Sequence, residues 1–358
     1  QPGKGVVNGK QIHRTFPVNP TQPITAWGLI GAGIRAYDHM DGVGNRYGVH
    51  TVILEVDGEE VFRSVVDRFA YEENRYINSW THGQYMKSFI EPGNRLRMLH
   101  ASNGNRGLVE INEERPYRFV YTLSDALGNT SKVRFTVQGK NTEIHPVEHR
   151  EKYAFKWDRT NYLQEPGLEL VVPRGMLYDD VWLDYSVRAD SGDVAFTYQL
   201  HNKRVPLHGA CEMRIGLRRD RLEDKSKYYV AGVTARGGKY SIGGTYEDGF
   251  MKVRIRDLGT YTVAVDTVPP EIIPLNPGQW GRTGRITLKA KDKETGINSY
   301  RGTIDGKYAL FGKPNSISGN LVCELDPKHV KKGGRHTVEM TVTDGRGNRT
   351  TEEFHFVW

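Results

Sequence analysis

Short rows of alternating hydrophobic and polar residues recur along the whole chain. Alternation puts one face of a strand in a core and the other in water, as in antiparallel sheets. The rows fall at residues 132–137, 251–256, 261–265, 286–290, 338–342 and 354–356. No window of roughly 12 residues or more has a convincing helical period, although the stretch 66–80 is ambiguous and compatible with a helical turn. The pattern predicts an all-β protein.

Two distant parts of the chain share a series of turn signals. Asp57-Gly58 recurs as Asp305-Gly306, and the Asp-x-x-Gly-Asn segment at 125–129 recurs at 344–348. Asp-Gly favours a tight hairpin turn, and Asp-x-x-Gly-Asn combines a turn-capping side chain with a residue that accepts a positive φ. The repeat predicts two copies of one immunoglobulin-like β-sandwich, one early in the chain and one at its end.

The turn-rich segments between the rows divide the chain. We expect a polar lead-in arm at 1–24, a β-sandwich with large insertions at 25–140, a middle β-sandwich at 141–266 and an immunoglobulin-like sandwich at 267–358. The Pro269-Pro270 pair ends a strand and stiffens the second boundary. The predicted fold class is therefore tandem β-sandwich domains, of which the first and last are immunoglobulin-like.

Composition and charge narrow the classes of function. The 358 residues are 37% hydrophobic, and no apolar run approaches the ~18 residues of a membrane span, so we expect no membrane span. The net charge of +7 is spread along the chain, and its densest runs, at 218–221 and 328–332, lie beside turn residues. Solvated loops explain these runs, and no nucleic-acid-binding signature accompanies them. We expect no nucleic acid partner.

Metal and nucleophile signals are weak. The candidates for zinc are His145 with His149 and His201 with His208; those for calcium are Asp38, Asp41 and Asn45, and Asp292 with Glu294. Proline lies between the histidines of each pair, and neither acidic stretch has the alternating ladder of a calcium loop, so turns explain all of them.

The sequence gives no stronger indication of a nucleophilic serine or cysteine. No Gly-x-Ser-x-Gly occurs. Cys211 and Cys323 fall in different predicted domains, so we expect them to be packed in strands and not joined as a disulfide. We therefore predict no catalytic residue, metal ligand or cofactor in this chain.

Tryptophan offers a possible sugar-binding platform, because a flat apolar ring matches the C–H face of a pyranose. The chain has six tryptophans: Trp27, Trp80, Trp157, Trp182, Trp280 and Trp358. Core packing is the alternative for each of them. Trp80 and Trp280 lie next to polar turn residues, which makes them the candidate ligand-binding residues.

The first predicted sandwich carries a series of motifs typical of one family. The series comprises 31–38, Asp41-Gly42, 45–49, 56–58, Asp67-Arg68-Phe69, 75–78, Pro92-Gly93-Asn94, 105–107 and 125–131. It resembles the region just after the catalytic domain in lysostaphin-like zinc metallopeptidases of gut-dwelling Gram-negative bacteria. The resemblance covers residues 25–137 densely and the rest more loosely.

The resemblance implies export, to the periplasm or the cell surface, and proximity to peptidoglycan. That family's zinc site uses His-x-x-x-Asp and His-x-His, and neither occurs in these 358 residues, so no catalytic residue is carried over. The chain begins without Met or an apolar leader, so we expect a removed signal or a fragment of a longer protein. Zinc would then lie in an upstream catalytic domain, unless this member has lost it.

Three functions follow as expectations. The first is a non-catalytic accessory region of a secreted cell-wall metallopeptidase, whose partners are peptidoglycan, another glycan or its own peptidase domain. The alternative is a stand-alone carbohydrate-binding or surface adhesion protein. A third alternative is a hydrolase whose site these motifs do not cover.

Overall fold

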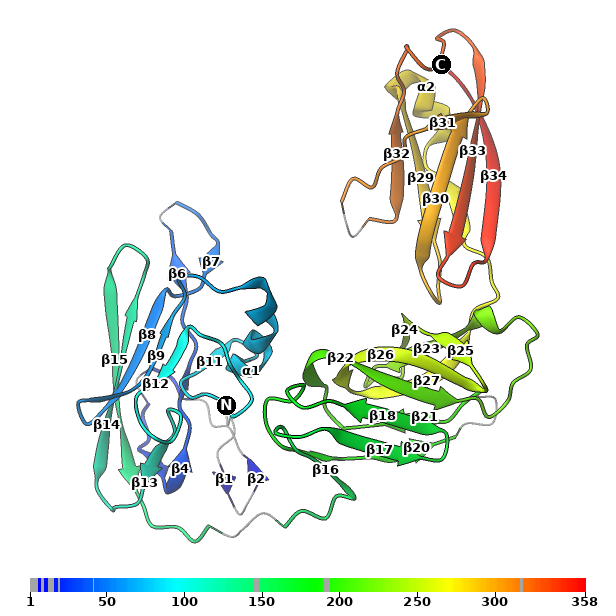
Figure 1. Ribbon diagram of the computed structural model, residues 1–358. Coiled ribbons are helices and arrows are strands. Elements are labelled where there is room, and N and C mark those ends of the chain that lie inside the picture. The colour runs from blue at the N-terminus through cyan, green and yellow to red at the C-terminus, as the bar shows by residue number, and fades with distance from the viewer. Residues whose placement is uncertain are drawn as a thin grey trace. The chain divides into compact units, whose positions relative to one another are not determined.

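The computed structural model describes residues 6–7, 10–11, 16–18, 20–40, 42–144, 148–189, 194–315 and 318–358. The chain divides into two compact units. Unit 1 takes its described residues from 1–161, 172–183 and 206–210, and unit 2 comprises 162–171, 184–205 and 211–358. Each unit is built almost wholly from strands (Figure 1). The predicted all-β class of tandem sandwiches is confirmed.

The first sandwich is organised around a six-stranded sheet. In spatial order its strands are β12 (Leu99–Ala101), β9 (Glu59–Val65), β8 (Thr51–Val56), β14 (Pro116–Ser124), β15 (Thr130–Gly139) and β3 (Ile24–Ala26). β14 and β15 form a long antiparallel hairpin, and β3 joins the sheet edge parallel to β15. The predicted row at 132–137 is thus confirmed as β15.

Smaller elements complete the first sandwich. They are β4 (Gly28–Ile30) with β13 (Val109–Ile111), β5 (Gly33–Ile34) with β11 (Tyr85–Lys87) and β10 (Thr81–His82), the β6 (Asp38–His39) and β7 (Arg46–Tyr47) hairpin, and η1 (Tyr71–Tyr76) followed by α1 (Ile77–Trp80). The helical turn expected within 66–80 is therefore η1 and α1. Leu54, Phe62, Ile111 and Phe119 are buried in the core. A separate two-stranded ladder pairs β1 (Val6–Val7) with β2 (Lys10–Gln11).

The middle region holds two five-stranded sheets. One has the order β17 (Asn161–Glu165), β18 (Leu168–Val172), β22 (Val205–Gly216), β26 (Phe250–Leu258), β25 (Thr245–Glu247); the other has the order β20 (Ser186–Arg188), β21 (Thr197–Gln199), β27 (Thr260–Val265), β23 (Tyr228–Val233), β24 (Lys239–Gly243). A two-stranded ladder pairs β16 (Tyr153–Phe155) with β19 (Val181–Leu183). The short helix η2 (Lys225–Lys227) leads into β23. Leu168, Tyr198, Met213 and Tyr228 are fully buried here.

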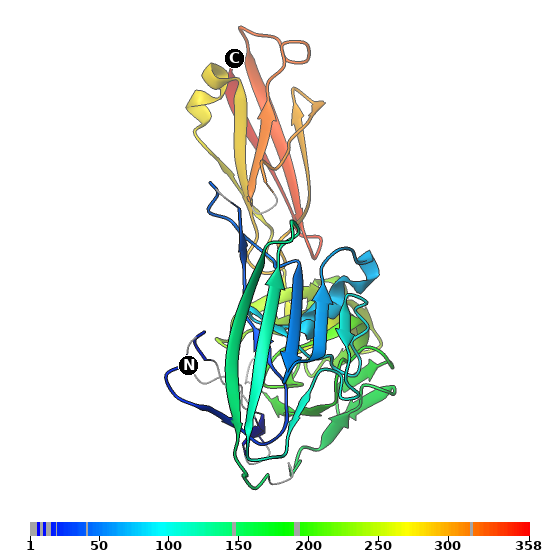
Figure 2. The same cartoon turned by 90° about the vertical axis from the view of Figure 1, so that its left-hand side faces the viewer.

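The last sandwich packs a three-stranded sheet against a four-stranded one. The first has the order β28 (Glu271–Pro274), β29 (Arg285–Lys291), β32 (Asn320–Glu324), and the second the order β31 (Lys307–Ala309), β30 (Ile297–Ile304), β33 (Arg335–Asp344), β34 (Arg349–Val357). In the turned view these strands run from yellow to red (Figure 2). The helical segments η3 (Pro277–Gln279) and α2 (Trp280–Thr283) cross between β28 and β29. Leu288, Val338 and Met340 are buried in its core.

The predicted repeat is confirmed in the turns. Asp57 and Asp305 both have positive φ, 52° and 49°, and each is followed by a glycine of positive φ, as the tightest hairpins require. Each Asp carboxylate also accepts a backbone N–H from the neighbouring strand, from Arg118 and Thr337 respectively. The early and late sandwiches therefore share turn chemistry as well as strand order.

Two further expectations can be compared with the described residues. Cys211 lies in β22 and Cys323 in β32; both are free and buried, as expected for packed strand residues. The expected turn around Val205-Pro206 is wrong, because these residues begin β22, where a proline costs no ladder hydrogen bond at a strand start. Among the described residues, no helix is long and apolar enough to cross a membrane.

Candidate functional site

Unit 2 contains a polar junction between the middle region and the last sandwich. Two loops of the last sandwich are shaped by aspartates that cap their own turns. The Asp344 carboxylate accepts the backbone N–H groups of Arg346 and Asn348 at 2.7 and 2.9 Å. The Asp292 carboxylate accepts those of Thr295 and Gly296, both at 2.7 Å. These turns hold the loop ends against the linker that begins at Asp266.

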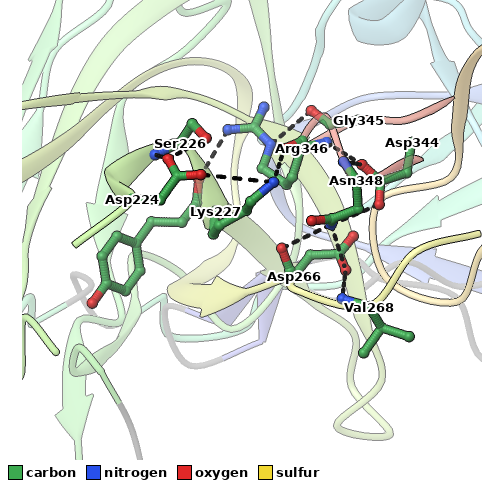
Figure 3. Close-up of polar contacts among 10 residues, drawn as sticks. Asp224, Ser226, Lys227, Asp266, Val268, Asp344, Gly345, Arg346 and Asn348 are labelled. Atoms are coloured by element: carbon green, nitrogen blue, oxygen red, sulfur yellow. Dashed lines mark hydrogen bonds and ion pairs between the residues drawn. The ribbon is translucent and has the colours of Figure 1, made fainter. Parts of the chain in front are cut away.

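Asn348 connects the last sandwich to that linker. Its side-chain amide donates to the main-chain oxygen of Asp266 at 3.0 Å and to the Asp344 carboxylate at 2.8 Å (Figure 3). Asn348 is only 8% exposed, and Asp266 is 1% exposed. The Thr295 hydroxyl donates to the Asp266 carboxylate at 2.5 Å. Buried polar groups are therefore matched donor to acceptor across this boundary.

Arg346 reaches from the last sandwich into the middle region. Its guanidinium donates to the main-chain oxygens of Tyr228 and Gly244 at 2.9 and 3.0 Å. The Lys227 ammonium in turn donates to the Arg346 main-chain oxygen at 3.0 Å (Figure 3). Burial lowers the pKa of Arg346, while the Asp344 and Asp266 charges act to raise it. This exchange of charged donors fastens the two sandwiches to each other.

The junction also contains the one group of described residues that could hold a metal ion. The carboxylates of Asp266, Asp292 and Asp344 each offer an oxygen, and these oxygens lie within 4.8 Å of one another. Burial, with the charges of Asp292 and Asp344, raises the pKa of Asp266. Because hydrogen bonds within the junction already satisfy these carboxylates, the cluster by itself does not indicate an ion.

A second feature lies in unit 1, where large side chains are exposed on two neighbouring segments. We call these side chains the aromatic surface: Met40, Val43, Tyr47, Val66, Phe69 and Tyr71. The first three belong to the segment that forms the β6–β7 hairpin, and the others follow β9. Val66 donates its N–H to the His50 oxygen at 2.7 Å, so the segment after β9 starts opposite the residue that precedes β8, three residues past the end of β7.

Polar side chains accompany the rings of the aromatic surface. The Arg46 guanidinium lies 5.1 Å from the centroid of the Tyr37 ring. Arg68 contacts Asp67 at 3.4 Å, with 91% of the Arg68 side chain exposed. Tyr71 is also 91% exposed. The segments that carry the exposed rings thus also carry exposed hydrogen-bond donors and acceptors, with Arg46 next to Tyr47 and Arg68 next to Phe69 in the chain.

The structure places the two predicted platform residues inside cores. Trp80 and Trp280 are 6% and 2% exposed. Their indole N–H groups donate to the main-chain oxygens of Lys87 and Leu275 at 3.0 and 2.8 Å. Trp280 does line an open depression together with Gln279 and Arg282, but its ring offers no open face. These positions favour core packing, and a binding role for either residue stays a prediction.

The described residues among the weak metal candidates make other contacts. His149 stacks on Trp182 with centroids 3.6 Å apart, while His145 and Asp41 lie outside the described residues. His201 accepts the Asp184 N–H through Nδ1 at 3.1 Å. Turn chemistry at Asp292, as predicted, accounts for its contacts, and Glu294 accepts the Tyr229 hydroxyl at 2.8 Å.

The sequence analysis missed two groups of residues. Only tryptophans were considered as platform residues, and the aromatic surface was not, although Asn45-Arg46-Tyr47 and Asp67-Arg68-Phe69 belong to the motif series of the first sandwich. It also missed that Asp266 and Asp344 join Asp292, since these residues come from a linker and two loops far apart in the chain.

One family model matches part of the chain. Residues 152–266, which include all strands from β16 to β27, match the model described as a Zu5-like domain. No curated protein matches the chain. The matching family is not a lysostaphin-like peptidase, so that resemblance of the first sandwich stays a proposal.

Similar solved structures are distant. One is SGBP-B of the Bacteroides ovatus mixed-linkage glucan utilization locus in complex with a mixed-linkage heptasaccharide. It is 11% identical in sequence, the match covers 100% of this chain and 70% of that chain, and the TM-score is 0.16. Another is a Ca²⁺-stabilized adhesin by which an Antarctic bacterium binds ice, with 11% identity, coverages of 93% and 95%, and a TM-score of 0.17. The protocadherin γB4 extracellular domain has 10% identity, coverages of 100% and 82%, and a TM-score of 0.19. At these TM-scores none of them carries an argument about function.

Proposed function

We propose that this chain is a non-catalytic carbohydrate-binding region of an exported surface protein, and that the aromatic surface of the first sandwich is its binding face. The observation that carries the proposal is the grouping of Tyr47, Phe69 and Tyr71, which are 40%, 43% and 91% exposed, on two adjacent segments of one sandwich. Soluble proteins rarely leave neighbouring large rings open to water unless they contact something.

Carbohydrate fits the chemistry of this face better than an apolar protein partner does. Sugar rings present C–H faces that stack on aromatic rings, and their hydroxyl groups need both donors and acceptors. Arg46, which precedes Tyr47 in the chain, and Arg68, which precedes Phe69, supply donors, and Asp67 supplies an acceptor. An apolar partner would bury these charges at a large desolvation cost.

The polar junction supports the same role in another way. The contacts of Arg346 and Asn348 fasten two successive sandwiches of unit 2 to each other, which suits these two sandwiches to a role as one spacer. The three sandwiches are then binding and spacing modules.

Affinity electrophoresis of the full chain in gels that contain soluble polysaccharides tests the proposal. We expect retardation by at least one polysaccharide, and loss of that retardation in the double variant Phe69→Ala, Tyr71→Ala. The matched control is Tyr308→Ala, which removes a ring that is 66% exposed on the last sandwich. Equal retardation of the wild type and the double variant would remove the aromatic surface as the binding face.

A second candidate is the accessory region of a lysostaphin-like cell-wall peptidase, located in the periplasm or at the cell surface. The resemblance of residues 25–137 favours it, and Tyr47 and Phe69 belong to that motif series. In this candidate zinc is held by a domain outside this chain. Sedimentation with purified peptidoglycan sacculi distinguishes the two, because this candidate requires retention on sacculi that soluble neutral glucans do not compete.

A further inference from the structure

His208 lies in a small aromatic cluster of unit 1 that the proposed function does not use. Its ring stacks on Tyr76 of η1, with centroids 4.1 Å apart and an interplanar angle of 27°. The Tyr178 ring meets it edge-on at 6.0 Å and 89°. Tyr178 is 5% exposed, and His208 is half-buried. The cluster joins three parts of unit 1, which are η1, the segment that precedes β19, and strand β22.

Hydrogen bonds also link the segments that carry these stacked side chains. The Tyr178 hydroxyl donates to the Arg75 main-chain oxygen at 2.6 Å, so its oxygen is left to accept from Nδ1 of His208 at 3.4 Å. The Arg75 guanidinium donates twice to the Leu207 main-chain oxygen, at 3.2 and 2.7 Å. Nδ1–H is therefore the neutral tautomer that suits the site, and a further proton would go to Nε2.

Burial and the Arg75 charge oppose that further proton on His208. Arg75, whose guanidinium binds the oxygen of the preceding residue Leu207, places a positive charge near the imidazole. Burial raises the pKa of Tyr178 to about 12. Glu91 and Asp179 lie near Tyr178, and burial raises the pKa of Asp179. Burial first, and then the Arg75 charge, lower the pKa of His208 below its ordinary value of 6.5.

We propose that His208 is an acid-sensitive latch: protonation of its imidazole releases the contact that ties Arg75 and Tyr76 of η1 to Tyr178 and the start of β22. The neutral ring stacks on Tyr76 and meets Tyr178 edge-on, whereas the charged ring must regain water and move away from the guanidinium. Release opens this contact while the sheets of the sandwich stay folded.

The direction of the pH effect follows from linkage. A base whose pKa is lower in the closed state than in the open state binds its proton mainly when the latch is open. The closed state is therefore fully favoured above pH 6.5 and loses stability as the pH falls. The opening equilibrium rises by up to about tenfold for each pH unit below that value, until the closed-state pKa is reached.

Two measurements on the full chain test the latch. NMR of ¹³C-histidine-labelled protein, with the His208 signal assigned by its loss in His208→Gln, gives the titration midpoint, which we expect below 6.5. Hydrogen exchange of peptides that cover 74–80 and 204–211, corrected for the intrinsic pH dependence, is expected to speed up between pH 7.5 and 5.5.

Variants separate the latch from general acid sensitivity. His208→Phe keeps a ring on Tyr76 but cannot titrate, so its exchange in both segments should not respond to pH. His100→Gln changes an exposed histidine of the same unit and should behave as the wild type. A His208 midpoint at or above 6.5, or equal acid-induced exchange in His208→Phe and wild type, overturns the proposal. If His208→Phe does not fold, the NMR midpoint still decides.

Discussion

Asn348 donates its side-chain amide to the main-chain oxygen of Asp266 over 3.0 Å, and so joins the last sandwich to the linker that precedes it. The equivalent residue of the first sandwich, Asn129, donates to the carboxylate of its own turn, Asp125, at 2.6 Å. The side chain of this asparagine caps its own turn in both sandwiches, and in the last sandwich it also makes a buried connection to the linker.

This difference predicts unequal effects of the same substitution. Asn348→Ala leaves buried oxygens of Asp266 and Asp344 without their donor and should lower the free energy of unfolding by about 2 kcal/mol. Asn129→Ala removes an exposed contact and should cost less than about 1 kcal/mol. Urea unfolding followed by tryptophan fluorescence measures both. Equal losses in the two variants would contradict a connecting role for Asn348.

Asp266→Asn should stabilise the protein at neutral pH by roughly 1 kcal/mol, because it removes one of three neighbouring carboxylate charges, of which Asp266 and Asp344 are buried. The folded-state pKa of Asp266 is raised above 3.8, so the folded protein holds this proton more tightly than the unfolded chain does. The contribution of Asp266 to the free energy of unfolding therefore falls as the pH rises. The advantage of the variant should therefore shrink toward pH 4 and disappear below it. Thermal unfolding from pH 4 to 8 checks the trend, and a variant less stable than wild type at pH 7 would refute it.

Gly93 should not tolerate a side chain. A Cβ there would lie 2.4 Å from the Leu177 oxygen and 2.8 Å from the Tyr178 Cα. Because backbone atoms cannot yield, we expect Gly93→Ala to cost about 2 kcal/mol or more. Gly104→Ala is the control, since no heavy atom lies within 4 Å of its added Cβ. Denaturant midpoints compare the two, and a harmless Gly93→Ala would mean that this close approach is absent in solution.

Both cysteines should be slow to react in the folded protein. Burial raises the pKa of the Cys211 and Cys323 thiols to about 11. At pH 8 the thiolate fraction is then roughly a hundredfold lower than for an ordinary thiol. Mass spectrometry after iodoacetamide treatment should find little modification of the native chain and complete modification in urea. Fast labelling of the native protein would show that β22 or β32 opens readily.

Much of the fold could be predicted because its signals are local. Alternation over 132–137 and 338–342 needs only a strand with one wet face, and β15 and β33 lie where the pattern indicated. The Asp57-Gly58 and Asp305-Gly306 turns follow from backbone conformations that these residue types accept. The start of β22 was missed because Val205-Pro206 looks like a turn in isolation, and only pairing within a sheet makes it a strand.

The candidate sites could be predicted only in part. Trp80 and Trp280 carry the right ring for a sugar, but the cores around them bury both, whereas Tyr47 and Tyr71 remain open. Exposure depends on all the neighbours that the fold brings to a side chain, and no local pattern encodes it. The same holds for His208, whose two tyrosine neighbours come from segments distant in the chain.

The amino-acid sequence by itself determined the all-β class and the duplicated sandwich, because strand alternation and Asp-Gly turns are set by each residue and its near neighbours. Only the tertiary structure decided that Asn348 reaches the linker while Asn129 contacts only its own turn, that three aspartates share one junction, and that Trp80 and Trp280 are buried while Tyr47 and Tyr71 are exposed. The reason is physical: burial, charge proximity and hydrogen-bond partners are properties of contacts between segments far apart in the chain.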